Sequence, residues 1–89
     1  MGRSRLTDIF GRNLRRLRTA KGLSQEGLAH LVGVHRNYVG ALERGERNPT
    51  LVSVERVAEA LGTDPAEMLR ESQSATPDLG PRPDLKTTD

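Results

Sequence analysis

The stretch QEGLAHLVGVHRNYVGAL, residues 25–42, decides how the chain of 89 residues is organised. Its first half repeats apolar residues at the spacing of a helix, and a second periodic run follows after Gly33. Two short helices that cross steeply need a small residue where their backbones approach, and Ala29 supplies it. The turn between them needs a residue that tolerates positive φ, and Gly33 supplies that. The stretch therefore predicts two short helices joined by a tight turn.

Three further helices are predicted around this pair. A first helix is expected over residues 8–21, with a stripe of Leu6, Phe10, Leu14 and Leu17. Thr50 is suited to cap a later helix, whose stripe consists of Leu51, Val54, Val57, Ala58 and Leu61. Asp64 and Pro65 then begin a short last helix, which carries Met68 and Leu69 as its apolar residues. The expected fold class is all-α, a bundle of five helices.

The domain organisation expected from the sequence is simple. Residues 1–7 form a flexible N-terminal arm, residues 8–71 form one folded domain, and residues 72–89 form a disordered tail. The tail contains three prolines, few apolar residues and no periodicity. Nothing in it offsets the entropy lost on ordering.

Composition and charge narrow the function. The absence of cysteine excludes disulfides, thiolate zinc sites and a thiol nucleophile. No apolar run approaches the length of a membrane span, so no membrane partner and a cytoplasmic location are expected. Residues 1–48 carry ten basic and four acidic side chains, whereas residues 49–89 carry four and eight. A basic half of this kind suits a polyanion, although the charge asymmetry on its own would favour a merely solvated surface.

The two-helix stretch resembles the DNA-binding domain of the Cro and phage-repressor (XRE-like) type. Gln25 opens its first helix, Val39 and Leu42 anchor its second, and the resemblance spans residues 10–69. It implies a helix-turn-helix fold of five helices whose second motif helix reads the major groove of double-stranded DNA. The segment HRNYVGALER, residues 35–44, also resembles controller proteins of restriction-modification systems. The chain departs from the family at Gly27, where an acidic residue usually completes the capping box.

The resemblance implies that the start of the reading helix, residues 35–44, contacts bases. Arg36 can pair with guanine O6 and N7, and Asn37 with adenine N6 and N7, each discriminating by about 1–3 kcal/mol. Gly40 and Ala41 follow on the same face, where Gly40 would let the backbone approach DNA and Ala41 would touch a thymine methyl. Without the surrounding motif, Arg36 and Asn37 would be interpreted as ordinary solvated helix residues.

Phosphate contacts are expected to frame the reading helix. Gln25 matches the phosphate-binding glutamine of the family and lies at a helix N-terminus, where exposed N–H groups favour an anion. The other candidates are Tyr38, Arg44, Arg47 and Asn48. Tyr38 has two roles of equal weight, because its hydroxyl could bind a phosphate or its ring could pack against the neighbouring helix.

Other charged residues have different expected roles. Arg18 and Glu43 match a family pair that forms an interior salt bridge beneath the reading helix, the alternative being two unrelated surface charges. Arg15 and Arg16 are weaker candidates for extending the phosphate-binding surface. His35 is interpreted as a weak helix cap. No metal or other cofactor is expected, because no acidic or thiol cluster accompanies the two histidines.

The expected function is sequence-specific DNA-binding transcriptional regulation by a homodimer on a palindromic operator. One reading helix covers few base pairs, and the family compensates with two-fold symmetry. The candidate anchors of the dimer interface are Val52, Leu61, Met68 and Leu69. RNA polymerase is a further candidate partner.

The alternative is an antitoxin-type module that binds a toxin and autoregulates its operon, although the tail has no amphipathic stripe to bind one. An enzyme is not expected, because the sequence has no nucleophile elbow, metal motif or glycine-rich phosphate loop.

Overall fold

The computed structural model describes residues 4–71, and within this range the fold is entirely helical. The helices are α1 (Arg5–Ala20), α2 (Gln25–Val32), α3 (Arg36–Glu43), α4 (Leu51–Leu61) and α5 (Pro65–Met68). Five helices in this order confirm the expected fold class. None of the helices in the described range is long and apolar enough to cross a membrane. The expected disordered tail, residues 72–89, lies outside the described residues.

Side-chain caps explain where the helices begin. Ser24 Oγ accepts from the Gly27 backbone N–H at 2.8 Å to begin α2, and Thr50 Oγ1 accepts from the Ser53 N–H at 3.0 Å to begin α4. Both caps begin their helices where the sequence places them. Gly33 ends α2 at φ 85°, which is the left-handed conformation required by the tight turn.

The start of α1 differs from the prediction. Ser4 Oγ accepts from the Thr7 backbone N–H at 3.0 Å, so Ser4 is the cap and the helix begins at Arg5 rather than Asp8. Residues 5–7 therefore belong to the helix and not to a flexible arm. The prediction missed the hydroxyl of Ser4, a side chain of the type that favours this position.

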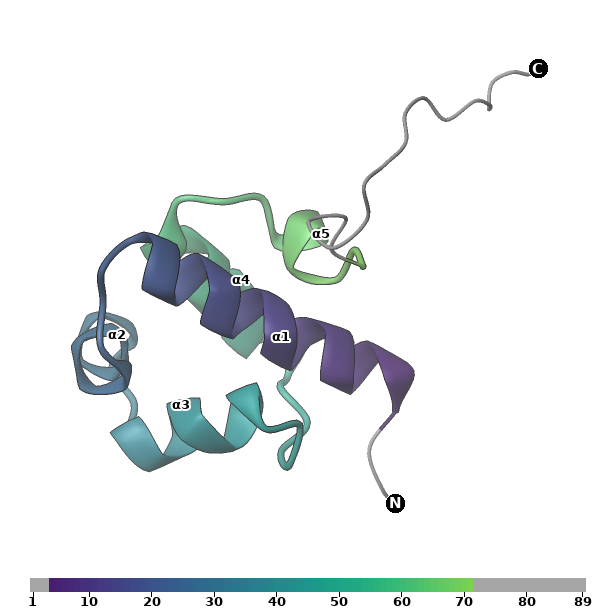
Figure 1. The fold of residues 1–89 in the computed structure, drawn as a ribbon, viewed down its shortest axis with the longest axis horizontal. Helices are drawn as coiled ribbons and strands as arrows, with labels where there is room; N and C mark the ends of the chain where they lie inside the picture. The colour runs from purple at the N-terminus through teal and green to yellow at the C-terminus, as the bar shows by residue number, and fades with distance from the viewer. Residues whose placement is uncertain (1–3, 72–89) are drawn as a thin grey trace.

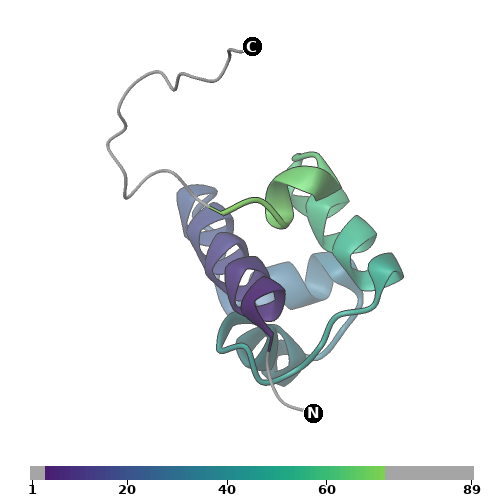
Figure 2. The ribbon, with the colours of Figure 1, turned by 90° about the vertical axis from the view of Figure 1, so that its right-hand side faces the viewer.

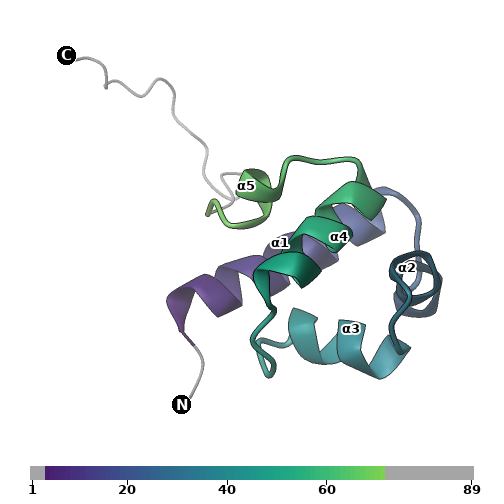
Figure 3. The same ribbon diagram turned by 180° about the vertical axis from the view of Figure 1, so that it is seen from behind.

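α1 is the element on which the other helices are assembled. It contacts α3, α4 and α5, while α2 contacts α3 and α4. Figure 1 shows α1 running across the molecule above α3 and in front of α4, and Figure 3, seen from behind, shows α4 in front of α1. α2 is seen end-on in Figure 1 and lengthwise in Figure 2, whereas α3 is seen lengthwise in Figure 1 and end-on in Figure 2. The two motif helices therefore cross steeply, as the sequence predicts.

The hydrophobic core draws residues from all five helices. Its members are Phe10, Leu14, Leu28, Ala29, Val39, Leu42, Val54, Val57, Ala58, Leu61 and Met68. Burying a leucine or phenylalanine side chain contributes about 1.5–3 kcal/mol relative to leaving it exposed. The core therefore fixes both motif helices against α1 and α4.

Two residues expected in core stripes lie outside the core. Leu6 is 49% exposed and Leu51 is 82% exposed, whereas Ile9 is buried. Helical spacing shows which residues share a face, but it does not show whether a neighbouring element covers that face. Leu6 and Leu51 lie in the first turns of α1 and α4, at the ends of these helices, where their side chains are exposed.

Two predicted dimer anchors are wrong. Leu61 is 3% exposed and Met68 is 0% exposed, so neither side chain is accessible to a second subunit. Both lie in the protomer's own core, because α4 and α5 pack against each other and against α1. Val52, which is 57% exposed, and Leu69, which is partly buried, remain as candidates.

Gly11 and Asn13, which the sequence analysis did not single out, fix how α1 packs. A Cβ built on Gly11 would lie 2.5 Å from the Leu42 carbonyl oxygen and 2.8 Å from that of Glu43. The backbones of α1 and the end of α3 are therefore in direct contact. Asn13 is fully buried, and its Nδ2 donates to the carbonyls of Met68 and Arg70, both at 2.8 Å.

Candidate nucleic-acid interface

The first turn of α3 carries Arg36 and Asn37, the two principal candidates for base contact. His35 caps this turn, because its Nδ1 accepts from the Asn37 backbone N–H at 3.0 Å. Both candidate side chains are exposed, and Arg36 Nη1 lies 3.8 Å from Glu26 Oε1 on α2. An exposed pair at this distance contributes little to stability. Arg36 can therefore exchange Glu26 for another partner at small cost.

An open hollow of about 510 Å³ lies between the start of α2 and the exposed face of α3. It is lined by Arg18, Ser24, Gln25, Glu26, Arg36, Asn37, Gly40 and Arg44. Most of the residues predicted to contact DNA are therefore brought together at one place. Ala41 is partly buried and does not line the hollow, while Tyr38, Arg47 and Asn48 lie beyond it.

Gly40 forms the floor of the hollow and is buried, contrary to its expected role as a base contact. A Cβ built on Gly40 would lie 3.1 Å from Arg44 Nη1 and 3.4 Å from Gln25 Oε1. These two side chains therefore cover the glycine. A glycine at this position leaves room for both side chains.

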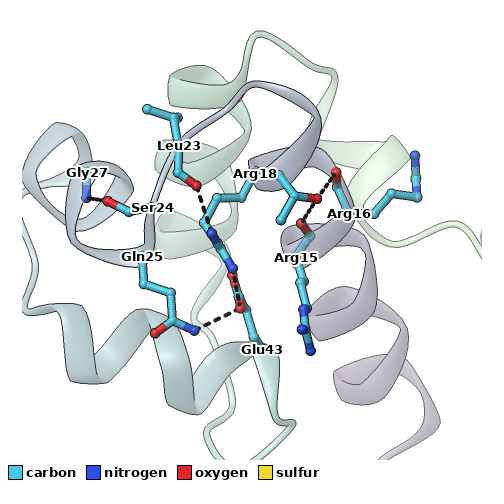
Figure 4. Close-up of polar contacts among 9 residues, drawn as sticks. Arg15, Arg16, Arg18, Leu23, Ser24, Gln25, Gly27 and Glu43 are labelled. Carbon is cyan, nitrogen blue, oxygen red and sulfur yellow. Dashed lines mark hydrogen bonds and ion pairs between the residues drawn. The ribbon is translucent and has the colours of Figure 1, made fainter.

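Arg18 and Glu43 form a buried ion pair beneath α3, with Arg18 Nε 2.6 Å from Glu43 Oε2 and side-chain exposures of 11% and 4%. Arg18 Nη2 donates to Glu43 Oε1 at 3.2 Å, and Arg18 Nη1 donates to the Leu23 carbonyl at 2.7 Å. Gln25 Nε2 also donates to Glu43 Oε1, at 3.0 Å (Figure 4). Because an ionised carboxylate only accepts, it fixes which end of the Gln25 amide faces it.

The ring of Tyr38 packs against the core, which favours the second of its two expected roles. Its hydroxyl lies 3.3 Å from Ser53 Oγ, and the Arg47 guanidinium lies 5.1 Å from the centroid of its ring. The hydroxyl therefore has a partner on α4. The cation–π contact in turn holds Arg47 in the loop after α3.

Asn48 and Arg44 also have partners within the protein. Asn48 Oδ1 accepts from Thr7 Oγ1 at 3.1 Å, which ties the loop after α3 to the first turn of α1. Arg44 Nε lies 3.1 Å from Glu46 Oε2. The hydrogen bond and the negative charge of Glu46 raise the pKa of Arg44. Arg44 therefore stays charged and can exchange this exposed carboxylate for a phosphate.

Sequence reasoning missed two contributors to this site. Glu26 pairs with Arg36 across the hollow, and its place one residue after Gln25 could have suggested a contact with the start of α3. Gly11 sets the distance between α1 and the end of α3. A glycine in the middle of a helix, where it costs about 1 kcal/mol relative to alanine, is the signal that could have identified this close approach.

Comparison with known proteins agrees with this geometry. Residues 9–70 match the family model described as helix-turn-helix domain. Control protein C.SmaI of Serratia marcescens is 42% identical over 64 residues, which cover 72% of this chain and 76% of that protein. Control protein C.BamHI of Bacillus amyloliquefaciens is 40% identical over 62 residues, which cover 68% of this chain and 76% of that protein.

A solved structure supports the same assignment. The crystal structure of the restriction-modification controller protein C.AhdI from Aeromonas hydrophila superimposes with a TM-score of 0.67 at 55% sequence identity. The match covers 70% of this chain and 94% of that chain. These similarities confirm the family resemblance inferred from the sequence. The chain therefore belongs to the helix-turn-helix domain family of DNA-binding transcriptional regulators.

Proposed function

We propose that this protein recognises one operator sequence, with α3 lying in the major groove of DNA. The observation that carries this proposal is the capped first turn of α3, which holds Arg36 and Asn37 exposed at the edge of the hollow. Arg36 would bind guanine and Asn37 adenine, since their side chains match the hydrogen-bonding edges of these bases. Ala41, which lies on the same helix, would contact a thymine methyl group of the DNA.

Phosphate contacts would hold α3 in register. Gln25 has a second hydrogen on Nε2 after donating to Glu43, and a phosphate oxygen can accept it. Arg44 and Arg47 would bind phosphates as charged donors from the end of α3 and from the loop after it. Asn48 has its Oδ1 engaged with Thr7, so its amide NH₂ would be the group that donates.

The protein would bind its operator as a homodimer. Three of the four large apolar side chains exposed within residues 4–71 are Leu6, Leu51 and Val52, which lie in the first turns of α1 and α4. Leu6, Leu51 and Leu69 line an apolar groove of about 530 Å³. We call Leu6, Leu51, Val52 and Leu69 the end surface. A second copy packed there would cover it and would present two reading helices to a palindromic operator.

The role of the regulator is inferred from its relatives. The similarity to C.SmaI, C.BamHI and C.AhdI supports a controller of a restriction-modification system. A palindrome upstream of the gene, with a restriction gene beside it, would support this role. The antitoxin alternative depends on residues 72–89, and no feature within residues 4–71 favours it.

Binding selection from a randomised duplex library tests the proposal and supplies the operator. The Arg36→Ala variant should then lose about 1–3 kcal/mol per half-site on the selected duplex, while its affinity for random duplex changes much less. The Arg47→Ala variant should weaken binding to both duplexes. It should also make the slope of log affinity against log salt shallower by about one unit per lost phosphate contact.

The two variants control for each other, because each removes one exposed arginine. Fluorescence anisotropy on both duplexes across a salt series separates their effects. If Arg36→Ala weakened binding to every sequence equally, Arg36 would be a phosphate contact and the assignment of the reading residues would be wrong. If the selection returned no preferred sequence, the proposal of a specific operator would fail.

A further inference from the structure

Arg15 lies on the face of α1 that packs against α3, although its side chain is exposed. It follows Gly11 by four residues and precedes Arg18 by three, and both spacings place residues on one helical face. Gly11 touches the carbonyls of Leu42 and Glu43, while Arg18 binds the Glu43 carboxylate. Arg15 therefore lies between two contacts that fix α1 against the end of α3.

The direction of the Arg15 side chain separates it from its neighbour Arg16. Figure 4 shows Arg15 extending from α1 toward the side on which α3 lies, whereas Arg16 points away from that side. Arg16 Nη2 also donates to Asn13 Oδ1 at 3.1 Å, which draws it toward the α5 side of α1. The two arginines are adjacent in sequence and equal in charge, but only Arg15 faces the proposed DNA interface.

Arg15 also differs from the arginines of the hollow in having no carboxylate partner among residues 4–71. Arg18, Arg36 and Arg44 are paired with Glu43, Glu26 and Glu46, respectively. Arg36 and Arg44 must exchange a carboxylate for DNA, whereas Arg15 would bind a phosphate without giving up an ion pair within the described part of the chain. A cationic side chain that lies at the edge of a basic interface and has no such ion pair is well placed to bind a polyanion.

We propose that Arg15 is an additional phosphate-contact residue, which extends the DNA interface from α3 onto α1. This inference rests on the proposed function and names a contact outside the helix-turn-helix itself. Arg15 would bind the DNA backbone beside the bases that α3 reads. The contact would add affinity and salt dependence but no sequence preference, because phosphates are the same at every step.

The test compares Arg15→Ala with two matched variants of the full-length protein. Arg16→Ala removes the adjacent charge on another face of α1, and Arg56→Ala removes an exposed charge from α4. Each is titrated by fluorescence anisotropy with selected and random duplexes between 50 and 200 mM salt. Arg15→Ala should make the log–log slope shallower by about one unit per subunit on both duplexes, at an unchanged melting temperature. The slopes of the two controls should match the wild type.

Two outcomes would overturn the assignment of Arg15 alone. The first is a slope for Arg15→Ala equal to that of Arg16→Ala, with the wild type still selective and Arg36→Ala still losing that selectivity. The second is a lower melting temperature for Arg15→Ala with no change of slope, which would mean that Arg15 stabilises the C-terminal end of α3. Failure of the wild type to bind any duplex would instead overturn both this inference and the proposed function.

Discussion

At the scale of single residues, each of the three guanidinium nitrogens of Arg18 has an acceptor. Nε and Nη2 donate to the two carboxylate oxygens of Glu43, and Nη1 donates to the Leu23 carbonyl. Removing two charges from water costs several kcal/mol, and a buried pair is tolerated only when its geometry is good and its remaining donors are satisfied. The loss of either partner would leave the other charge buried without compensation.

Replacing Arg18 with alanine should therefore lower the free energy of unfolding by about 3–5 kcal/mol. Arg15→Ala is the matched control, because it removes an exposed arginine from the same helix and should cost no more than about 0.5 kcal/mol. Urea denaturation followed by circular dichroism measures both. Equal losses for the two variants would show that the buried pair is not the source of the difference.

Two glycines in the middle of helices should respond in opposite ways to an added methyl group. At Gly11 the new Cβ would meet backbone carbonyl oxygens at 2.5 Å and 2.8 Å, so α1 and α3 would have to separate. Gly11→Ala should then lower the free energy of unfolding by about 1–3 kcal/mol, despite the better helix propensity of alanine. The same measurement on Gly40→Ala provides the comparison.

At Gly40 the nearest atoms belong to the ends of two side chains, Arg44 Nη1 at 3.1 Å and Gln25 Oε1 at 3.4 Å, so a small shift of the Arg44 side chain makes room for the methyl group. Gly40→Ala should therefore leave stability unchanged or raise it by up to about 1 kcal/mol through helix propensity. A loss as large as that of Gly11→Ala would contradict the proposed difference between backbone and side-chain neighbours.

At the scale of elements, α5 is too short to persist by itself, because helices of fewer than about twelve residues are marginal in water. Met68 anchors it in the core, and Asn13 of α1 donates to the carbonyl oxygens of Met68, its last residue, and of Arg70, which follows it. The position of α5 therefore depends on a single buried amide as well as on apolar packing. Leu69, which belongs to the end surface, is carried by the same segment.

Asn13→Asp tests this dependence, because it keeps the shape of the side chain while it removes both hydrogens of Nδ2. A carboxylate facing carbonyl oxygens would leave them unpaired, at a cost of about 1–3 kcal/mol or more. We expect amide hydrogen exchange to accelerate in residues 66–70 more than in α2 and α3. Uniform acceleration over the whole domain would mean that Asn13 stabilises the global fold and not α5 in particular.

The elements were predictable from the sequence to the extent that their signals are local. Ser24, Thr50 and Asp64 cap the helices that they were expected to cap, because a cap acts on a backbone group two or three residues away. Burial depends instead on which elements cover a face. The sequence does not show which element covers which face. For this reason the exposure of Leu51 and the burial of Asn13 were not predicted.

The same distinction applies to the candidate site. Arg36 and Asn37 lie in the exposed first turn of α3, as their place in the motif predicts. Other contacts join residues that are far apart in the sequence, namely Gln25 over Gly40, Tyr38 with Ser53, and Asn48 with Thr7. Such contacts follow from the packing of whole helices and not from helical spacing.

At the scale of the whole molecule, the two proposed surfaces occupy different parts of the domain, although α1 contributes residues to both. The hollow lies between α2 and α3, whereas the end surface lies on α1, α4 and the residue after α5. A second subunit could therefore pack on the end surface and leave both reading helices exposed. Dimerisation and DNA reading should then be separable by substitution, although each supports the other when the operator has two half-sites.

Leu51→Glu should separate them. Leu51 is 82% exposed, so a carboxylate there costs the protomer little, but it would be buried unpaired in a dimer that packs on the end surface. Sedimentation should show that this variant is a monomer, and circular dichroism should show that it remains helical. It should bind the full palindrome weakly and a single half-site with unchanged affinity. Leu31→Glu is the control, because Leu31 is 58% exposed on α2, away from the groove, and should leave association unchanged. Dimers that persist in Leu51→Glu, or that are lost equally in both variants, would place the interface elsewhere.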